Sequence, residues 1–140
     1  MSVYRLTQTD TEKAMKVVEL FFNRNASIPQ IELFLSGKNN YLLTYEDKHK
    51  LVGFAYGYEL QRFDGRKNMM YMHQVEVLPE HRKQGIGKKL MKSFIEICKQ
   101  NDCERLFLIT NKSNVPAVTL YNGVGGKTFH DDDILYAVST

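Results

Sequence analysis

A basic, glycine-containing turn is the part of this sequence whose residue types could do chemistry. It reads Arg82-Lys83-Gln84-Gly85-Ile86-Gly87-Lys88, after an apolar run that Pro79 ends and before a long amphipathic pattern. The first N–H groups of a helix have no partner within the helix and carry about half a positive charge. Glycine removes the Cβ that would hold a ligand away from those groups. The turn therefore predicts a cradle for a diphosphate, with close packing as the alternative explanation of its glycines.

Two common phosphate-binding signatures do not fit this turn. A Walker loop needs a glycine five residues before Gly87 and a serine or threonine after Lys88, and the chain has neither. The dinucleotide fingerprint would place its first glycine at Arg82, and the turn does not open an N-terminal βαβ unit.

Metal and thiol chemistry is not indicated. Cys98 falls on the apolar side of a helical pattern and is expected in the core, and Cys103 is too far along the chain for a C-x-x-C pair. The four histidines follow no ligand spacing; they are His49, His73, His81 and His130. We therefore predict no metal site.

The elements that must position the turn form an alternating α/β pattern. The clearest helix covers 85–100, where apolar residues recur at helical spacing. Further helices are predicted over 9–25, 29–37 and 114–121, the last capped by Asn114. Strands are predicted over 3–6, 41–45, 51–60, 69–78 and 105–110, with two final strands near 127–129 and 134–138.

Composition places limits on the class of protein. The chain has 140 residues, 43% of them hydrophobic and 25% charged, which is typical of one globular domain over residues 1–140. A net charge of +3 argues against a whole-protein nucleic-acid footprint. No signal peptide and no membrane-spanning run are recognised, so we expect a cytoplasmic protein without nucleic-acid or membrane partners.

Two blocks together resemble a known family. The first is Arg82-x-x-Gly85-x-Gly87, between the strand end Val75-Glu76-Val77-x-Pro79 and an amphipathic helix. The second is Asn114-x-x-Ala117-x-x-Leu120-Tyr121, followed by Gly125. Their order and separation resemble the GNAT superfamily of N-acetyltransferases over nearly the whole chain. Within it, the chain looks most like the aminoglycoside 3-N-acetyltransferase branch, on Tyr58-Glu59-Leu60, Phe63, Tyr71, His81-Arg82-Lys83-Gln84-Gly85-Ile86, Pro116-Ala117-Val118 and Leu120-Tyr121. Gln74 and Gly126 depart from that branch, and the departures concern the substrate more than the chemistry.

The resemblance implies a fold. It is an α/β (α+β) arrangement with a mixed, mostly antiparallel sheet of six to seven strands and about four helices. A central pair of parallel strands would splay apart in that sheet. Relatives are often dimers, so the resemblance is also compatible with a homodimer.

The resemblance further implies direct acetyl transfer from acetyl-CoA to a primary amine of a small molecule, with an aminoglycoside-like polyamine as one acceptor. The main-chain N–H groups of residues 83–88 would bind pyrophosphate, and main-chain groups of Val75 and Val77 would bind the pantetheine arm. Asn114 would cap its helix, contact that arm, or do both. The implied cofactor-binding residues are Val75, Val77, Arg82, Lys83, Gln84, Gly85, Ile86, Gly87, Lys88, Asn114 and Tyr121.

Two residues are implied in catalysis. Tyr121 matches the tyrosine that protonates the leaving thiolate in this family, although a tyrosine there could also simply pack at a helix end. Glu76 is the first candidate for the base, or for the group that orders a water relay, and Glu59 is the second. Each carboxylate could instead be a solvated strand residue.

Three alternatives remain open. The run Asp131-Asp132-Asp133 could recruit a polycationic substrate or be a solvated loop. The chain could be a non-enzymatic acyl-CoA-binding or regulatory module of the same fold. A nucleic-acid binder using the lysines of helix 85–100 is disfavoured, because no aromatic residues interleave with them.

Overall fold

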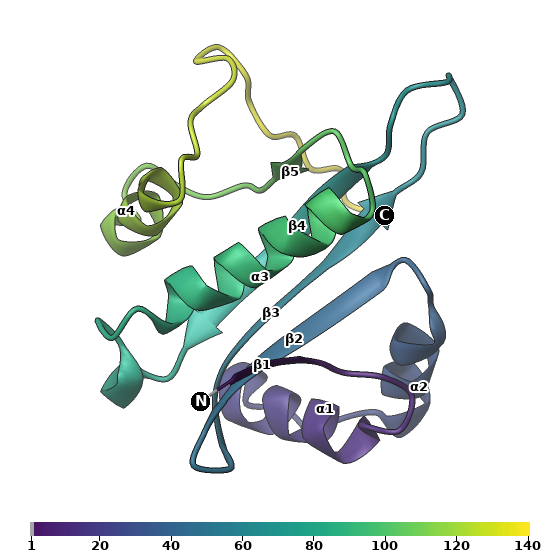
Figure 1. The fold of residues 1–140 in the computed structure, drawn as a ribbon, viewed down its shortest axis with the longest axis vertical. Coiled ribbons are helices and arrows are strands. Elements are labelled where there is room, and N and C mark those ends of the chain that lie inside the picture. Colours follow the sequence, from purple (N-terminus) through teal and green to yellow (C-terminus); the bar gives the residue numbers. More distant parts are fainter. Residues whose placement is uncertain (1) are drawn as a thin grey trace.

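One mixed sheet organises the computed structural model, which describes residues 2–140 (Figure 1). Its strand order is β1-β2-β3-β4-β5. The strands are β1 (Ser2–Arg5), β2 (Asn40–Asp47), β3 (Lys50–Leu60), β4 (Met69–Val77) and β5 (Leu106–Phe107). The pairs β1–β2, β2–β3 and β3–β4 are antiparallel, and the pair β4–β5 is parallel. The predicted mixed, mostly antiparallel class is confirmed.

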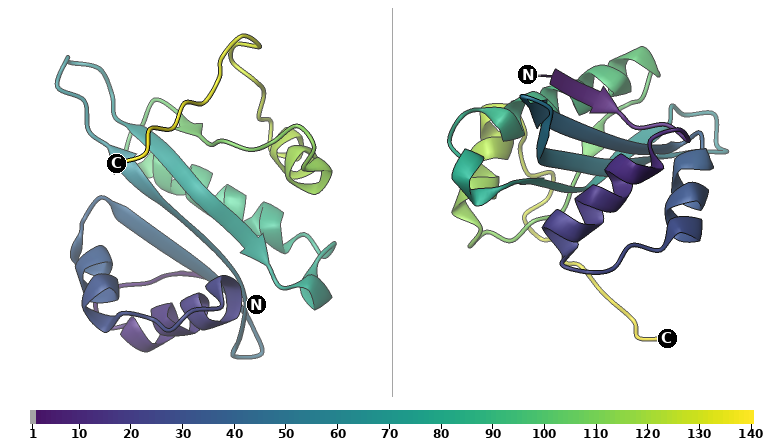
Figure 2. Two further views of the ribbon diagram at one scale, coloured as in Figure 1. Left: turned by 180° about the vertical axis from the view of Figure 1, so that it is seen from behind. Right: turned by 90° about the horizontal axis from the view of Figure 1, so that it is seen from below.

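Four α-helices cover the two faces of this sheet (Figure 2). They are α1 (Thr11–Val17), α2 (Ile28–Ser36), α3 (Ile86–Gln100) and α4 (Val115–Gly123). A π-helical turn, η1 (Val18–Phe22), continues α1, and a short 3₁₀ turn, η2 (Pro79–His81), follows β4. The predicted helix over 9–25 is therefore shorter, because Asn23 adopts a left-handed conformation that ends it.

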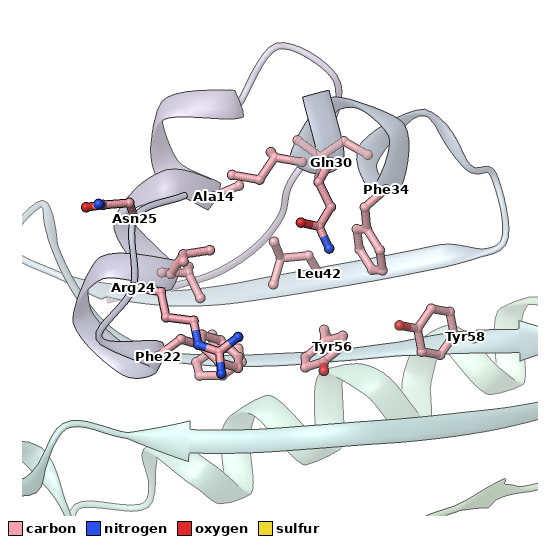
Figure 3. A pocket seen from close by; sticks show the side chains of 14 residues that line it. Ala14, Phe22, Arg24, Asn25, Gln30, Phe34, Leu42, Tyr56 and Tyr58 are labelled. Atoms are coloured by element: carbon pink, nitrogen blue, oxygen red, sulfur yellow. The ribbon is translucent and has the colours of Figure 1, made fainter. Parts of the chain in front are cut away.

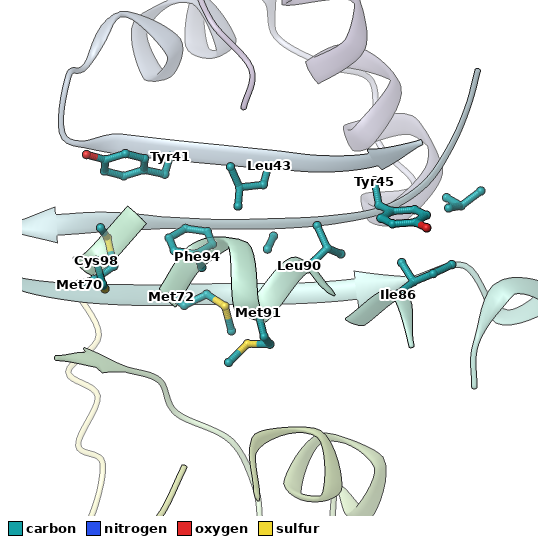
Figure 4. Close-up of a cluster of buried hydrophobic side chains, with 12 residues drawn as sticks. Tyr41, Leu43, Tyr45, Met70, Met72, Ile86, Leu90, Met91, Phe94 and Cys98 are labelled. Atoms are coloured by element: carbon teal, nitrogen blue, oxygen red, sulfur yellow. The ribbon is translucent and has the colours of Figure 1, made fainter. Parts of the chain in front are cut away.

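The main core lies between the sheet and α3 (Figure 4). Side chains from β2 and β4 meet the apolar side of α3, where Leu90 and Phe94 are fully buried. Gly53 lets the helix approach closely, since a Cβ there would lie 3.2 Å from Leu90 Cδ1 and 3.1 Å from the Glu76 carbonyl oxygen. The side chains of β3 alternate between faces, so Phe54 contacts η1 on the other side, with its ring centroid 4.7 Å from that of Phe21.

The parallel strand pair separates soon after it begins. Only two residue pairs join β4 to β5, Met70 with Leu106 and Tyr71 with Phe107. β4 continues to Val77, whereas β5 ends at Phe107. The predicted parallel pair is present and separates, but it is not central: β5 is the edge strand of the sheet, because the final strands expected beyond it do not form. One edge of the second half of β4 is therefore unpaired within residues 2–140.

The predicted number of strands is wrong: the sheet has five strands within residues 2–140. The final strands expected near 127–129 and 134–138 do not form, and residues 127–140 are exposed without regular structure. Their alternating apolar pattern is typical of a strand, but a strand needs an edge to pair with, and β5 offers only two residues. β5 is also shorter than the predicted 105–110, and Ile109 is exposed.

Among the described residues, no helix combines the length and the hydropathy that a bilayer crossing requires.

Candidate functional site

The basic turn places several main-chain N–H groups on one open surface. Lys83 has φ 62° and Gly85 has φ 80°, so two left-handed residues flank Gln84 immediately before α3 begins. Such alternation turns successive N–H groups toward one concavity. A Cβ built on Gly85 would meet no heavy atom within 4 Å, and Arg82, Lys83 and Lys88 are exposed. The turn therefore fits an anionic group such as a diphosphate.

The two glycines of this turn have different physical roles. Gly85 is the N-cap of α3, and its positive φ is a conformation that other residues adopt only with strain. At Gly87 a Cβ would lie 3.3 Å from Leu120 Cδ2 and 4.0 Å from Val77 Cγ2. The packing explanation of the glycines thus holds for Gly87, which lets α4 approach α3, and not for Gly85.

The unpaired edge of β4 ends beside this turn. The Leu78 N–H donates to the Val52 carbonyl of β3 at 2.9 Å. Because N–H directions alternate along a strand, those of Val75 and Val77 point to the other edge, which no strand pairs beyond Tyr71 in residues 2–140. On that edge the Val77 carbonyl accepts a hydrogen bond from Arg82 Nε at 3.0 Å. The turn therefore adjoins the unpaired edge of β4.

Glu76 lies on the sheet face that α1 and α2 cover. It is paired across the strands with Phe54, and Gln74 with Tyr56. Gln74 Nε2 donates to Glu76 Oε2 at 2.9 Å, so the predicted shared face of these two residues is confirmed. The side chains of Val75 and Val77 pack on the opposite face, against the core beneath α3.

Glu59, the second candidate base, is held in a separate network near the far end of β3. It accepts hydrogen bonds from Tyr41 Oη at 3.2 Å, from Asn68 Nδ2 at 2.8 Å and from Asn101 Nδ2 at 2.9 Å. Burial, together with the Glu59 carboxylate, raises the pKa of Tyr41. These bonds tie β2, the β3–β4 loop and the end of α3 together, so the geometry gives Glu59 a structural role.

Asn114 and Tyr121 both belong to α4. Asn114 Oδ1 accepts a hydrogen bond from the Ala117 N–H at 3.3 Å, so Asn114 caps the helix as predicted. Tyr121 is half-buried, packs against the main core, and has its pKa raised by burial. Gly126 turns back on the helix, since a Cβ there would lie 2.8 Å from the Tyr121 carbonyl oxygen. That contact explains why no larger residue follows Gly125.

Sequence reasoning did not predict a cavity of about 400 Å³ between the helices α1 and α2 and the strands β2 and β3 (Figure 3). Phe54, Tyr56 and Tyr58 of β3 form its sheet side. Arg24 and Gln30 extend toward the strands from the helical side (Figure 3). The signal in the sequence was the alternation of aromatic residues with small residues along β3.

The remaining reactive side chains lie outside these features. Burial raises the pKa of the Cys98 thiol to about 12, so the thiol stays protonated near neutral pH. In the described part of the chain, no cluster of three or more histidine, cysteine, aspartate or glutamate side chains could hold a metal ion.

A family model described as "Acetyltransferase (GNAT) family" matches residues 3–125. The "Putative [ribosomal protein bS18]-alanine N-acetyltransferase" of Bacillus subtilis (strain 168) is 33% identical over 94 residues, which are 67% of this chain and 58% of the relative. The thialysine N-epsilon-acetyltransferase of Bos taurus is 32% identical over 78 residues, which are 55% of this chain and 45% of the relative. The chain thus spans about half the length of these curated relatives.

Solved structures of similar fold cover almost the whole chain. An aminoglycoside acetyltransferase from an uncultured soil metagenomic sample, in complex with trehalose, has a TM-score of 0.89 at 21% identity, over 99% of this chain and 96% of that chain. An aminoglycoside N-acetyltransferase in complex with CoA has a TM-score of 0.80 at 16% identity, over 99% and 95%. At such identities the likeness establishes the fold.

Proposed function

This chain belongs to the acetyltransferase (GNAT) family, and from that premise we propose that it is an acetyl-CoA-dependent N-acetyltransferase domain that transfers the acetyl group directly to a primary amine of a small molecule. One observation carries the proposal. The open turn at residues 82–88 and the unpaired edge of β4 adjoin each other through the bond from Arg82 to Val77. Their main-chain donors match a ligand with an anionic head and an extended amide-rich arm.

Acetyl-CoA supplies an activated acyl group when bound. The N–H groups of residues 83–88 hold its pyrophosphate, while Arg82 and Lys88 add positive charge. Ile86 is 5% exposed and belongs to the core, so only its main chain is available to a ligand. The Val75 and Val77 N–H groups hold the arm, and one of them donates to the thioester carbonyl oxygen. Removing one such donor costs ~3–4 kcal/mol of transition-state stabilisation in comparable enzymes.

In the proposed reaction, each proton that moves has a donor and an acceptor. The amine nitrogen attacks the acetyl carbonyl carbon, a C–N bond forms and the C–S bond breaks. Glu76 accepts the proton that the ammonium group must lose, directly or through water. Tyr121 Oη donates a proton to the departing sulfur, and the second proton that the nitrogen loses as the amide forms passes through water to restore the Tyr121 phenol. Because burial raises the Tyr121 pKa above its ordinary value, the phenol carries that proton throughout the neutral range.

An aminoglycoside-like polyamine is the acceptor expected from the sequence. Its support is the family resemblance and the shared fold with aminoglycoside acetyltransferases. The acids considered for its recruitment, Asp131, Asp132 and Asp133, lie in the exposed C-terminal segment. The thialysine and ribosomal-protein substrates named for the curated relatives widen the set of amines that an assay must include.

The proposal is tested by release of coenzyme A thiol from acetyl-CoA in the presence of an amine panel. The panel holds an aminoglycoside, spermidine, amino acids, aromatic amines and a peptide N-terminus. We expect amine-dependent thiol release with at least one member. Binding of coenzyme A without thiol release from any member would favour the alternative, a non-enzymatic acyl-CoA-binding or regulatory module.

A further inference from the structure

We propose that the acceptor is a primary amine whose aromatic-sized apolar body carries a carboxylate, and that the cavity between the helices α1 and α2 and the strands β2 and β3 binds it. This inference rests on the proposed function, because it specifies the substrate class of the same site. The cavity is open to solvent on one side and has a volume of about 400 Å³, enough for one small ring-containing molecule (Figure 3).

Most of the cavity wall is apolar or aromatic. The sheet side is formed by Phe54, Tyr56 and Tyr58 together with Leu42, and Phe34 of α2 packs edge-on against both tyrosines, at centroid distances of 6.1 and 5.8 Å. Burial raises the pKa of Tyr56 and of Tyr58, so both phenols remain neutral hydrogen-bonding groups. Such a wall favours an apolar or aromatic body over a sugar.

The charge on the cavity lining is positive only. None of the fourteen lining residues is an aspartate or glutamate, and the only charged one is Arg24. Within residues 2–140 Arg24 forms no ion pair and no side-chain hydrogen bond. A guanidinium group presents a planar fork that matches a carboxylate. The lining therefore favours an acceptor with an anionic group at the Arg24 end.

The cavity lies beside the part of β4 that carries the proposed base, Glu76. Phe54 and Tyr56, which line it, are paired across the strands with Glu76 and Gln74. Residues paired in this way lie on one face, with Cβ atoms about 5 Å apart. An acceptor held against Phe54 and Tyr56 thus has its amine within reach of Glu76, on the strand whose outer edge holds the thioester.

A polycation fits this lining poorly. Each ammonium group that leaves water needs a carboxylate or several oxygen acceptors; Glu76 serves the one amine that reacts, and the cavity lining supplies no carboxylate for a second. Arg24 would repel a second positive charge. The structure thus argues against an aminoglycoside or polyamine as the preferred acceptor.

The inference is tested by a pair of substrates that differ only in the carboxylate. The first arm compares kcat/KM for para-(aminomethyl)benzoate, benzylamine and spermidine. We expect the carboxylate-bearing amine to exceed both others by about tenfold or more. A preference for spermidine, or equal values for the first two, would overturn the inference and leave acetyl transfer intact.

The second arm assigns that preference to Arg24. Arg24→Gln should remove the advantage of the carboxylate, and Arg24→Lys should retain part of it. Lys38→Gln is the matched control, because Lys38 is an exposed cation just beyond α2 that does not line the cavity. If the advantage survives in Arg24→Gln, the inference is wrong.

A third arm needs no catalysis. Calorimetry with phenylpropionate, which has no amine, should detect binding that Arg24→Gln weakens about tenfold or more and Lys38→Gln leaves unchanged. Should no amine support thiol release, the proposed function fails while this arm still decides the chemistry of the cavity. Binding that does not depend on Arg24, or no binding, would contradict it.

Discussion

Tyr121 lies in an environment that suits a proton donor. It is half-buried near the end of α4, and burial raises its pKa. We predict that Tyr121→Phe lowers kcat about 100-fold while the Kd for coenzyme A changes little. Because the raised pKa keeps the phenol protonated at both values, the defect should have the same size at pH 7 and at pH 9. Steady-state rates with Tyr136→Phe, in the exposed C-terminal segment, provide the control. A Tyr121→Phe enzyme of full rate would remove Tyr121 from the mechanism.

Glu76 of β4 is paired across the strands with Phe54, which lines the proposed acceptor cavity, and it accepts a hydrogen bond from Gln74. We predict that Glu76→Gln, which keeps the size of the side chain, lowers kcat about 100-fold, because the amide cannot accept the ammonium proton. Glu80→Gln, one exposed turn further along the chain, should be neutral. Equal rates for the two variants would show that water or the substrate itself handles the proton.

The sequence indicated these residues unequally. Glu76 and Gln74 could be placed on one face because side chains alternate along a strand. Glu59 looked equivalent in sequence, and only its bonds to Tyr41, Asn68 and Asn101, which come from distant elements, identify it as structural. Arg24 was missed because the role proposed for it depends on the absence of acids among the residues that α1, η1, α2, β2 and β3 contribute to the cavity.

At the scale of elements, the turn before α3 has a matched internal control. Gly85 with φ 80° and Gly65 with φ 85° both leave open space where a Cβ would be. We expect Gly85→Ala and Gly65→Ala to lose similar stability, about 1 kcal/mol each. Only Gly85→Ala should weaken coenzyme A binding in calorimetry, by about tenfold or more, because its Cβ enters the surface of N–H donors. Equal affinity of the two variants would reject the turn as the pyrophosphate site.

Elements with strong local patterns were predicted well and the others were not. The apolar spacing over 85–100 and the cap at Asn114 predicted two helices to within two residues at each end. The apolar run after Arg105 indicated burial, but burial does not specify pairing, and β5 is only Leu106–Phe107. The cavity could not be predicted, since its walls join segments that the sequence separates widely.

At the scale of the whole molecule, the C-terminal segment contributes little to the described fold. Residues 127–140 are exposed, and large apolar side chains such as Ile134 and Tyr136 are 73% and 81% exposed. We predict that deleting residues 131–140 shifts Tm by no more than about 3 °C in a thermal melt. A larger loss would mean that the segment packs on the domain or on a second copy. The homodimer stays a prediction. Sedimentation velocity on the full chain and on the chain that lacks residues 131–140 will test it.

The central claim is that main-chain amides of one turn and one strand edge bind coenzyme A. Two-dimensional amide NMR during a coenzyme A titration tests it directly, because each N–H reports its own environment. We predict the largest shifts at residues 83–88 and at Val75 and Val77. Saturation with coenzyme A that leaves those amides unmoved, while others respond, would contradict the account.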